Sequence, residues 1–131
     1  YRNSSIYGML GYFKLLRNDD LDETTKLCEE AYDYNSDDRD IKDNLSICYF
    51  RKGECEKAEK ISDELVGSTP NFVEGFYHGI QIAMKLNKYD KAAEYAEKLK
   101  ECKRSGMTTV TEEEVNKLIQ EVKNHNENTI G

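Results

Sequence analysis

The fold is decided by residues 39–72, RDIKDNLSICYFRKGECEKAEKISDELVGSTPNF, and by residues 73–104, VEGFYHGIQIAMKLNKYDKAAEYAEKLKECKR. The second stretch repeats the size classes of the first at a spacing of 34 residues. Three of the matched pairs are Lys57 and Lys91, Ala58 and Ala92, and Leu65 and Leu99. A period of this length is typical of stacked helical hairpins. The sequence therefore predicts an all-α protein built from tandem helix-turn-helix repeats.

Breaks in the pattern predict three hairpins, at about residues 4–38, 39–72 and 73–104. Gly53 follows the first helix of the second hairpin, where a helix commonly ends in a left-handed cap. Asn87 takes the same place in the third hairpin. Pro70 prevents a helix from continuing and so marks the boundary between these two hairpins.

The first hairpin differs from the second by one residue. The second helices match at a spacing of 34 residues, Leu27 with Ile61, whereas the first helices match at 35, Leu10 with Leu45. The extra residue therefore belongs to the polar turn at residues 18–20. Helical spacing predicts an apolar face on the first helix, formed by Ile6, Leu10, Phe13 and Leu16.

A last helix is predicted at about residues 112–123, where it would cap the array. Thr111 and Glu114 have the spacing of a capping box, and Val110 and Val115 that of a hydrophobic staple. The apolar stripe of this helix is narrow, as in a terminal helix with a polar outer face. We expect residues 1–124 to form one domain and residues 125–131 a flexible tail.

Composition limits the classes of partner. The 131 residues are 37% hydrophobic and 34% charged, and the net charge is −7. Nucleic acids and anionic membranes are recognised by basic surfaces, so neither is expected as a partner. No apolar run approaches the ~20 residues that a membrane-spanning helix requires. Because the chain begins at Tyr1, we expect it to be a piece of a longer protein.

The four cysteines, Cys28, Cys48, Cys55 and Cys102, form no CxxC pair, which disfavours a zinc site. Three of them lie on or beside predicted core positions, where cysteine behaves as a small apolar residue. We expect reduced thiols in a cytoplasmic protein. The calcium-loop pattern that begins at Asn18 lacks its required glycine, because Glu23 occupies that position. No catalytic residue, cofactor or metal site is therefore expected.

The second and third hairpins resemble the tetratricopeptide repeat (TPR), which has the pattern W-x2-L-G-x2-Y, A-x3-F and P. In the second hairpin the residues on this frame are Leu45, Tyr49, Gly53, Ala58 and Pro70. In the third hairpin they are Phe76, Ala92 and Ala96, and in the first they are Tyr7, Leu10 and Gly11. The resemblance covers residues 4–104.

The resemblance implies a superhelix in which the first helix of each hairpin lines a concave groove that holds a peptide or a partner helix. Transferred by position, the groove residues are Tyr12, Asn44, Ile47, Arg51, Tyr77, His78, Gln81 and Lys85. We expect a protein–protein interaction module, a scaffold or adaptor, and not an enzyme. The sequence leaves other readings open: a fragment of a peptide-sensing regulator, an accessory domain of a larger enzyme or chaperone, or a self-assembly module.

One subclass of these repeats binds C-terminal EEVD tails through a clamp of lysines, asparagines and an arginine. Asn44 matches one clamp position, but the others hold Gly8, Tyr12, Glu74 and His78. A glutamate in place of a basic fork disfavours the capture of a carboxylate. We therefore expect a repeat domain of the non-clamp type, whose partner and oligomeric state the sequence leaves open.

Overall fold

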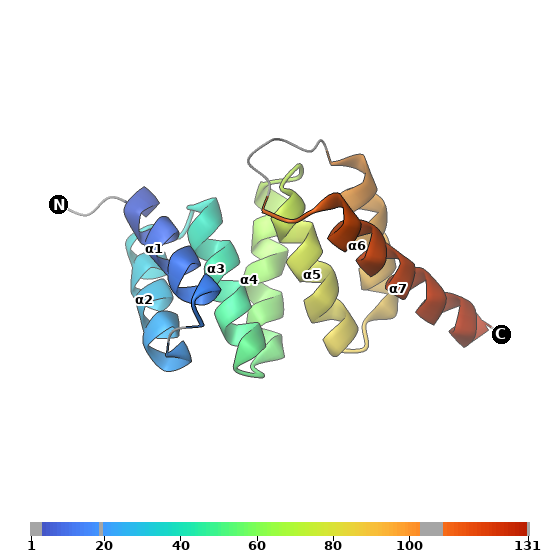
Figure 1. The fold of residues 1–131 in the computed structure, drawn as a ribbon, viewed down its shortest axis with the longest axis horizontal. Helices are drawn as coiled ribbons and strands as arrows, with labels where there is room; N and C mark the ends of the chain where they lie inside the picture. The colour runs from blue at the N-terminus through green and yellow to red at the C-terminus, as the bar shows by residue number, and fades with distance from the viewer. Residues whose placement is uncertain (1–3, 19, 103–108, 131) are drawn as a thin grey trace. The chain divides into compact units, whose positions relative to one another are not determined.

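The computed structural model describes residues 4–18, 20–102 and 109–130, with side chains described for residues 8–18, 20–102 and 109–126. Within these ranges there are seven helices and no strand. The helices are α1 (Ser4–Leu16), α2 (Leu21–Tyr34), α3 (Arg39–Arg51), α4 (Cys55–Ser68), α5 (Val73–Lys85), α6 (Tyr89–Glu101) and α7 (Glu112–Ile130). They form three helical hairpins followed by one further helix (Figure 1), so the predicted all-α repeat fold is confirmed. The predicted end of the third hairpin, near Arg104, lies outside the described residues.

The turn inside each hairpin contains a residue in the left-handed conformation, two positions after the last residue of the first helix. Gly53 has φ = 81° and Asn87 has φ = 61°, which confirms the predicted caps. After Gly53, the Glu54 N–H donates to the Tyr49 carbonyl at 2.8 Å, a bond that satisfies a carbonyl at the end of α3. Asn18 has φ = 54°, and the turn that follows it is one residue longer than the turn between α3 and α4, as the spacing predicted.

The contacts of the chain divide it into two compact units, residues 1–65 and residues 66–131, and the boundary falls within α4. Each unit has its own cluster of buried side chains. The cluster of the first unit is Leu15, Cys28, Leu45, Cys48 and Ile61. The second unit is centred on Phe76, Ile80, Ala92, Tyr95 and Leu99, and on α7 through Val115, Leu118 and Val122.

The apolar face predicted for α1 is not buried at its three described side chains, and the side chain of Ile6 lies outside the described residues. Leu10 is 42% exposed, Phe13 50% and Leu16 58%. Instead Gly11 and Leu15 face the rest of the first unit. A β-carbon added at Gly11 would lie 3.1 Å from the Asn44 amide nitrogen, so this glycine allows α1 to approach α3 closely.

The predicted start of α7 is confirmed. The Glu114 N–H donates to Thr111 Oγ1 at 3.1 Å, and the Thr111 N–H donates to Glu114 Oε1 at 3.1 Å. This backbone hydrogen bond lowers the pKa of Glu114. Val110 and Val115 are both buried, as expected of a hydrophobic staple.

The helix continues to Ile130, well past the predicted end near residue 123. The His125 ring stacks on the Tyr89 ring at the start of α6, with ring centroids 3.6 Å apart. This contact places His125, the first residue of the predicted tail, beside the start of α6. It arises from residues far apart in the sequence, so the pattern of α7 alone did not reveal it.

Cys28, Cys48 and Cys102 are buried and Cys55 is partly buried, which confirms the core positions predicted for three of the four thiols. All four are free thiols. Among the described residues, no helix has the length and apolar character needed to cross a membrane.

Candidate functional site

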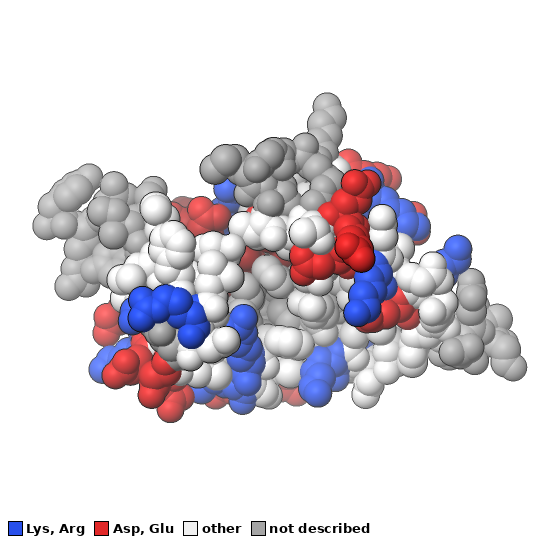
Figure 2. Space-filling view, in the orientation of Figure 1, with Lys and Arg blue, Asp and Glu red and all other residues white. Residues whose placement is uncertain are grey.

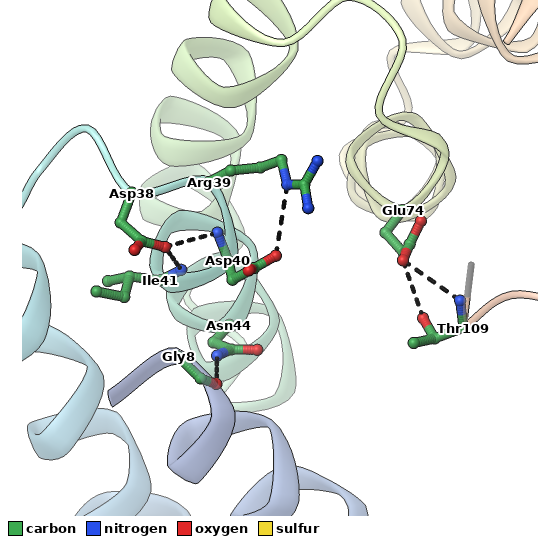
Figure 3. Close-up of polar contacts among 8 residues, drawn as sticks. All are labelled: Gly8, Asp38, Arg39, Asp40, Ile41, Asn44, Glu74 and Thr109. Carbon is green, nitrogen blue, oxygen red and sulfur yellow. Dashed lines mark hydrogen bonds and ion pairs between the residues drawn. The ribbon is translucent and has the colours of Figure 1, made fainter. Parts of the chain in front are cut away.

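The candidate residues of the first unit are Tyr12 on α1 and Asn44, Ile47 and Arg51 on α3. Asn44 is only 4% exposed. Its amide nitrogen donates to the Gly8 carbonyl at 2.8 Å, across the contact between α1 and α3 (Figure 3). Asn44 therefore holds the two helices together, and little of its side chain is left for a partner.

Arg51 is also held by a hydrogen bond to a residue far away in the sequence. Its guanidinium donates to the Leu15 carbonyl at 3.1 Å, near the end of α1. The bond satisfies a carbonyl of the last turn of α1, where a positive charge is also favourable. Tyr12 and Ile47 are both half-buried, and Ile47 packs against the core of the first unit. The first unit thus presents half-buried apolar surface beside a fixed arginine.

The start of α3 is acidic. Asp38 caps the helix by accepting the N–H groups of Asp40 at 2.9 Å and Ile41 at 3.1 Å (Figure 3). Asp40 is exposed and forms an ion pair with Arg39 at 3.5 Å. A β-carbon added at Gly8 would lie 3.3 Å from the Asp40 β-carbon. A longer side chain at Gly8, such as a clamp lysine, would have to displace this neighbour.

The candidate residues of the second unit lie on α5. Tyr77, His78 and Gln81 are half-buried and Lys85 is exposed. The rings of Tyr77 and His78 meet edge to face, with centroids 5.6 Å apart. Burial raises the pKa of Tyr77, and the carboxylates of Glu114 and Glu121 on α7 raise it further. Tyr77 therefore keeps its proton and offers both an apolar ring and a hydroxyl.

Glu74, at another clamp position on α5, is used within the second unit. Its Oε2 accepts the N–H and the hydroxyl of Thr109, both at 3.3 Å (Figure 3). This carboxylate fixes the segment that leads into α7. From the sequence, Glu74 was expected to disfavour the binding of a carboxylate. The contact with Thr109 could not be predicted, because the two residues are 35 positions apart.

No group of three or more His, Cys, Asp or Glu side chains among the described residues is arranged to hold a metal ion. The structure brings Tyr12, Asn44, Ile47 and Arg51 to the α1–α3 pair, and Tyr77, His78, Gln81 and Lys85 to α5. Sequence reasoning missed the exposed apolar residues Leu10 and Phe13 as a separate surface. Their helical spacing predicts an apolar face but does not show whether another helix covers it.

Comparison with solved structures identifies the fold. The TPR domain of Sgt2 from Aspergillus fumigatus matches 96% of this chain and 80% of its own length, with a TM-score of 0.81 and 17% identity. The first TPR of Spaghetti (RPAP3), solved with the HSP90 peptide SRMEEVD, matches 93% of this chain and 91% of its own length, with a TM-score of 0.76 and 14% identity.

A tetratricopeptide repeat protein from Parabacteroides merdae matches 94% of this chain but only 46% of its own length, with a TM-score of 0.70 and 18% identity. No protein-family model and no curated protein sequence matches the chain. The fold is thus that of TPR domains, as the sequence pattern indicated. At these identities the likeness concerns the fold alone.

Proposed function

We propose that this chain is a protein–protein interaction module that binds a peptide or helix of a partner on the first helices of its hairpins. The observation that carries the proposal is the nature of those helix surfaces. Tyr12, Ile47 and Tyr77 are half-buried, and in the first unit the polar side chains of Asn44 and Arg51 are already held in place by internal hydrogen bonds. A fixed surface loses little entropy on binding, and aromatic anchors usually dominate interface energy.

The partner is proposed to be of the non-clamp type, although one similar structure holds an HSP90 peptide ending in EEVD. Two features disfavour such a tail here: the acidic start of α3 at Asp38 and Asp40, and Glu74 on α5. Neither offers the basic fork that a terminal carboxylate requires. A neutral or basic segment with apolar anchors suits these surfaces better.

The clamp question is settled by titration of a fluorescent SRMEEVD peptide. We expect no saturable binding at micromolar concentration. A matched peptide with a C-terminal amide serves as the control. Tight binding that disappears with the amide would contradict the non-clamp assignment.

The binding surface is tested with peptides selected on the immobilised chain from a random display library. We expect Tyr77→Ala to weaken a selected peptide by more than ~1 kcal/mol, about fivefold, because an aromatic anchor is lost. The control is Tyr95→Ala, on α6 of the same hairpin: Tyr95 is buried, so its loss should affect stability more than binding. Selected peptides that ignore Tyr77 and Gln81 but depend on α2, α4 or α6 would refute the proposed surface.

The free thiols of Cys28, Cys48 and Cys102 support a reducing compartment, and we propose the cytoplasm. A scaffold or adaptor role, without catalysis, is part of the same proposal.

A further inference from the structure

Four of the five large hydrophobic side chains that are exposed in the described part of the chain lie on α1, where they form its outward face. Met9 is 59% exposed, and Leu10, Phe13 and Leu16 follow on the same side of the helix. Figure 2 shows a mostly uncharged surface over the described part of α1, with basic and acidic side chains below it. Helices α1 and α3 occupy equivalent positions in the internal repeat. The contacts of α3 therefore indicate what kind of structure covers the corresponding face of α1.

The register between α1 and α3 is fixed by their ends. Helix α1 ends at Leu16 and α3 at Arg51, and the left-handed residues Asn18 and Gly53 follow at the same distance. Each pair is separated by 35 positions. Leu10 therefore corresponds to Leu45, Phe13 to Cys48, Lys14 to Tyr49 and Arg17 to Lys52.

In α3 the two apolar positions are buried in the cluster of the first unit, to which α2 contributes Cys28, α1 contributes Leu15 and α4 contributes Ile61. Leu45 is 1% exposed and Cys48 is 0% exposed. Both belong to one cluster with Cys28 of α2, whose sulfur lies 3.8 Å from that of Cys48. The corresponding residues of α1, Leu10 and Phe13, are half exposed because no described helix takes the position of α2 against them.

Two polar residues of α3 also interact with carboxylates of α2. The Tyr49 hydroxyl donates to Glu29 Oε2 at 2.7 Å, and Lys52 Nζ lies 3.4 Å from Asp22 Oδ1. Asp22 and Glu29 are seven positions apart, so they lie on the same side of α2, two turns from each other. In α1 the corresponding positions hold two cations, Lys14 and Arg17, which suit carboxylates even better.

We propose that the outward face of α1 docks an amphipathic helix of a partner protein, and that this helix carries an apolar stripe with two acidic residues seven positions apart. The apolar stripe covers Leu10 and Phe13, and the acidic residues pair with Lys14 and Arg17. The geometry is that of α2 on α3. This surface adjoins the peptide-binding surface proposed above, because the ring centroids of Phe13 and Tyr12 lie 5.9 Å apart. The two proposals can still fail independently, since this one is tested at Phe13, Lys14 and Arg17 and the other at Tyr77 and Gln81.

A second copy of the chain suits this face poorly. The apolar sides of α2 and α7 are already buried within their own units. Apart from the residues of α1, Tyr34 is the only large hydrophobic side chain that is exposed in the described part of the chain. A self-contact would therefore place α1 against α1 and bring Lys14 and Arg17 of both copies close to each other.

The probe is a fluorescein-labelled peptide with the sequence of residues 21–34 and Cys28→Ala, held helical by a lactam between Lys26 and Glu30. Both lactam residues are exposed on α2, so the bridge leaves the docking side unchanged. Fluorescence anisotropy should show saturable binding to the whole chain. A second peptide with Asp22→Lys and Glu29→Lys should bind at least tenfold more weakly.

The decisive result is a reversal of the chain's preference between the two peptides when the charges on α1 are reversed. The chain with Lys14→Glu and Arg17→Glu should prefer the second peptide, whereas the control Lys117→Glu, an exposed residue on α7, should leave both affinities unchanged. Phe13→Asp should abolish binding while the helical circular-dichroism signal is kept. Absence of saturable binding, or equal affinity for both peptides, would overturn the proposal. So would a dimer in sedimentation that Phe13→Asp converts to a monomer, because the face would then serve a second copy.

Discussion

Replacing Asn44 by aspartate tests whether this residue is a packing contact, as the structure shows, or an accessible groove residue, as its position in the repeat implied. The amide nitrogen that donates to the Gly8 carbonyl at 2.8 Å becomes a second carboxylate oxygen. An ionised carboxylate cannot donate, and two oxygens at this distance repel each other. Asn44 is 4% exposed, so solvent gives the new charge little relief.

The expected loss has two parts. The amide–carbonyl hydrogen bond contributes about 1 kcal/mol. Burial and the facing carbonyl should raise the pKa of the introduced carboxyl by about 1–2 units above its usual ~3.9, and each unit corresponds to about 1.4 kcal/mol at neutral pH. The free energy of unfolding should therefore fall by about 3 kcal/mol at pH 7.5. For a chain of this size the midpoint temperature should fall by about 10 °C.

The pH dependence separates this cause from a simple packing defect. A group whose folded-state pKa is raised stabilises the folded state most when it is protonated, below the unfolded-state pKa near 4. That contribution disappears as the pH rises through the folded-state pKa. The difference from the natural chain should therefore be larger at pH 7.5 than at pH 5.

The measurement is urea unfolding followed by circular dichroism at 222 nm, at both pH values. Asn44→Ala is the matched variant without the charge, and its smaller loss should not change with pH. Asn71→Asp, at an exposed position, is the control for added negative charge. If Asn44→Asp were as stable as the natural chain at pH 7.5, the side chain would face solvent, and the helix contact described above would be wrong.

Further outcomes follow from the packing and the helix ends. Ala92→Leu should lower the free energy of unfolding by about 1–3 kcal/mol, because Ala92 is fully buried and has no room for a larger side chain; a neutral urea midpoint would mean that the repeat frame is misplaced. Gly53→Ala should destabilise by about 1–2 kcal/mol, because φ is 81° there. Gly67→Ala, inside α4 with open space around it, should instead stabilise by about 0.5–1 kcal/mol. Thr111→Ala should lower stability by about 1 kcal/mol through loss of the cap, again read from urea midpoints. Excess EDTA should leave the signal at 222 nm unchanged, and its loss would reveal a structural metal.

Several features of the fold could be predicted from the sequence because they depend on neighbours along the chain. Gly53 and Asn87 end their helices in the left-handed conformation, and Thr111 and Glu114 form the predicted capping box. The 34-residue period then identified the hairpins themselves. The helix caps and the capping box are local signals, since each involves residues within one or two helical turns.

The candidate binding residues are a different case. Their positions on α1, α3 and α5 followed from the repeat frame, but position alone did not show how much of each side chain is free. In the structure, Asn44 donates a hydrogen bond to the Gly8 carbonyl, and Arg51 donates one to the Leu15 carbonyl. Both partners lie 36 positions away in the sequence, beyond any local pattern.

By itself the sequence determined which segments become helices, where each hairpin turns, and which residues start and end the helices. Only the tertiary structure decided which apolar faces are covered. Leu10 and Phe13 have the same helical spacing as Leu45 and Cys48, yet the first pair is half exposed and the second is buried. Periodicity states that a helix has an apolar side, whereas burial depends on whether another helix packs against that side. Leu45 and Cys48 of α3 lie in a cluster with Cys28 of α2, Leu15 of α1 and Ile61 of α4, whereas no described helix covers the outward face of α1.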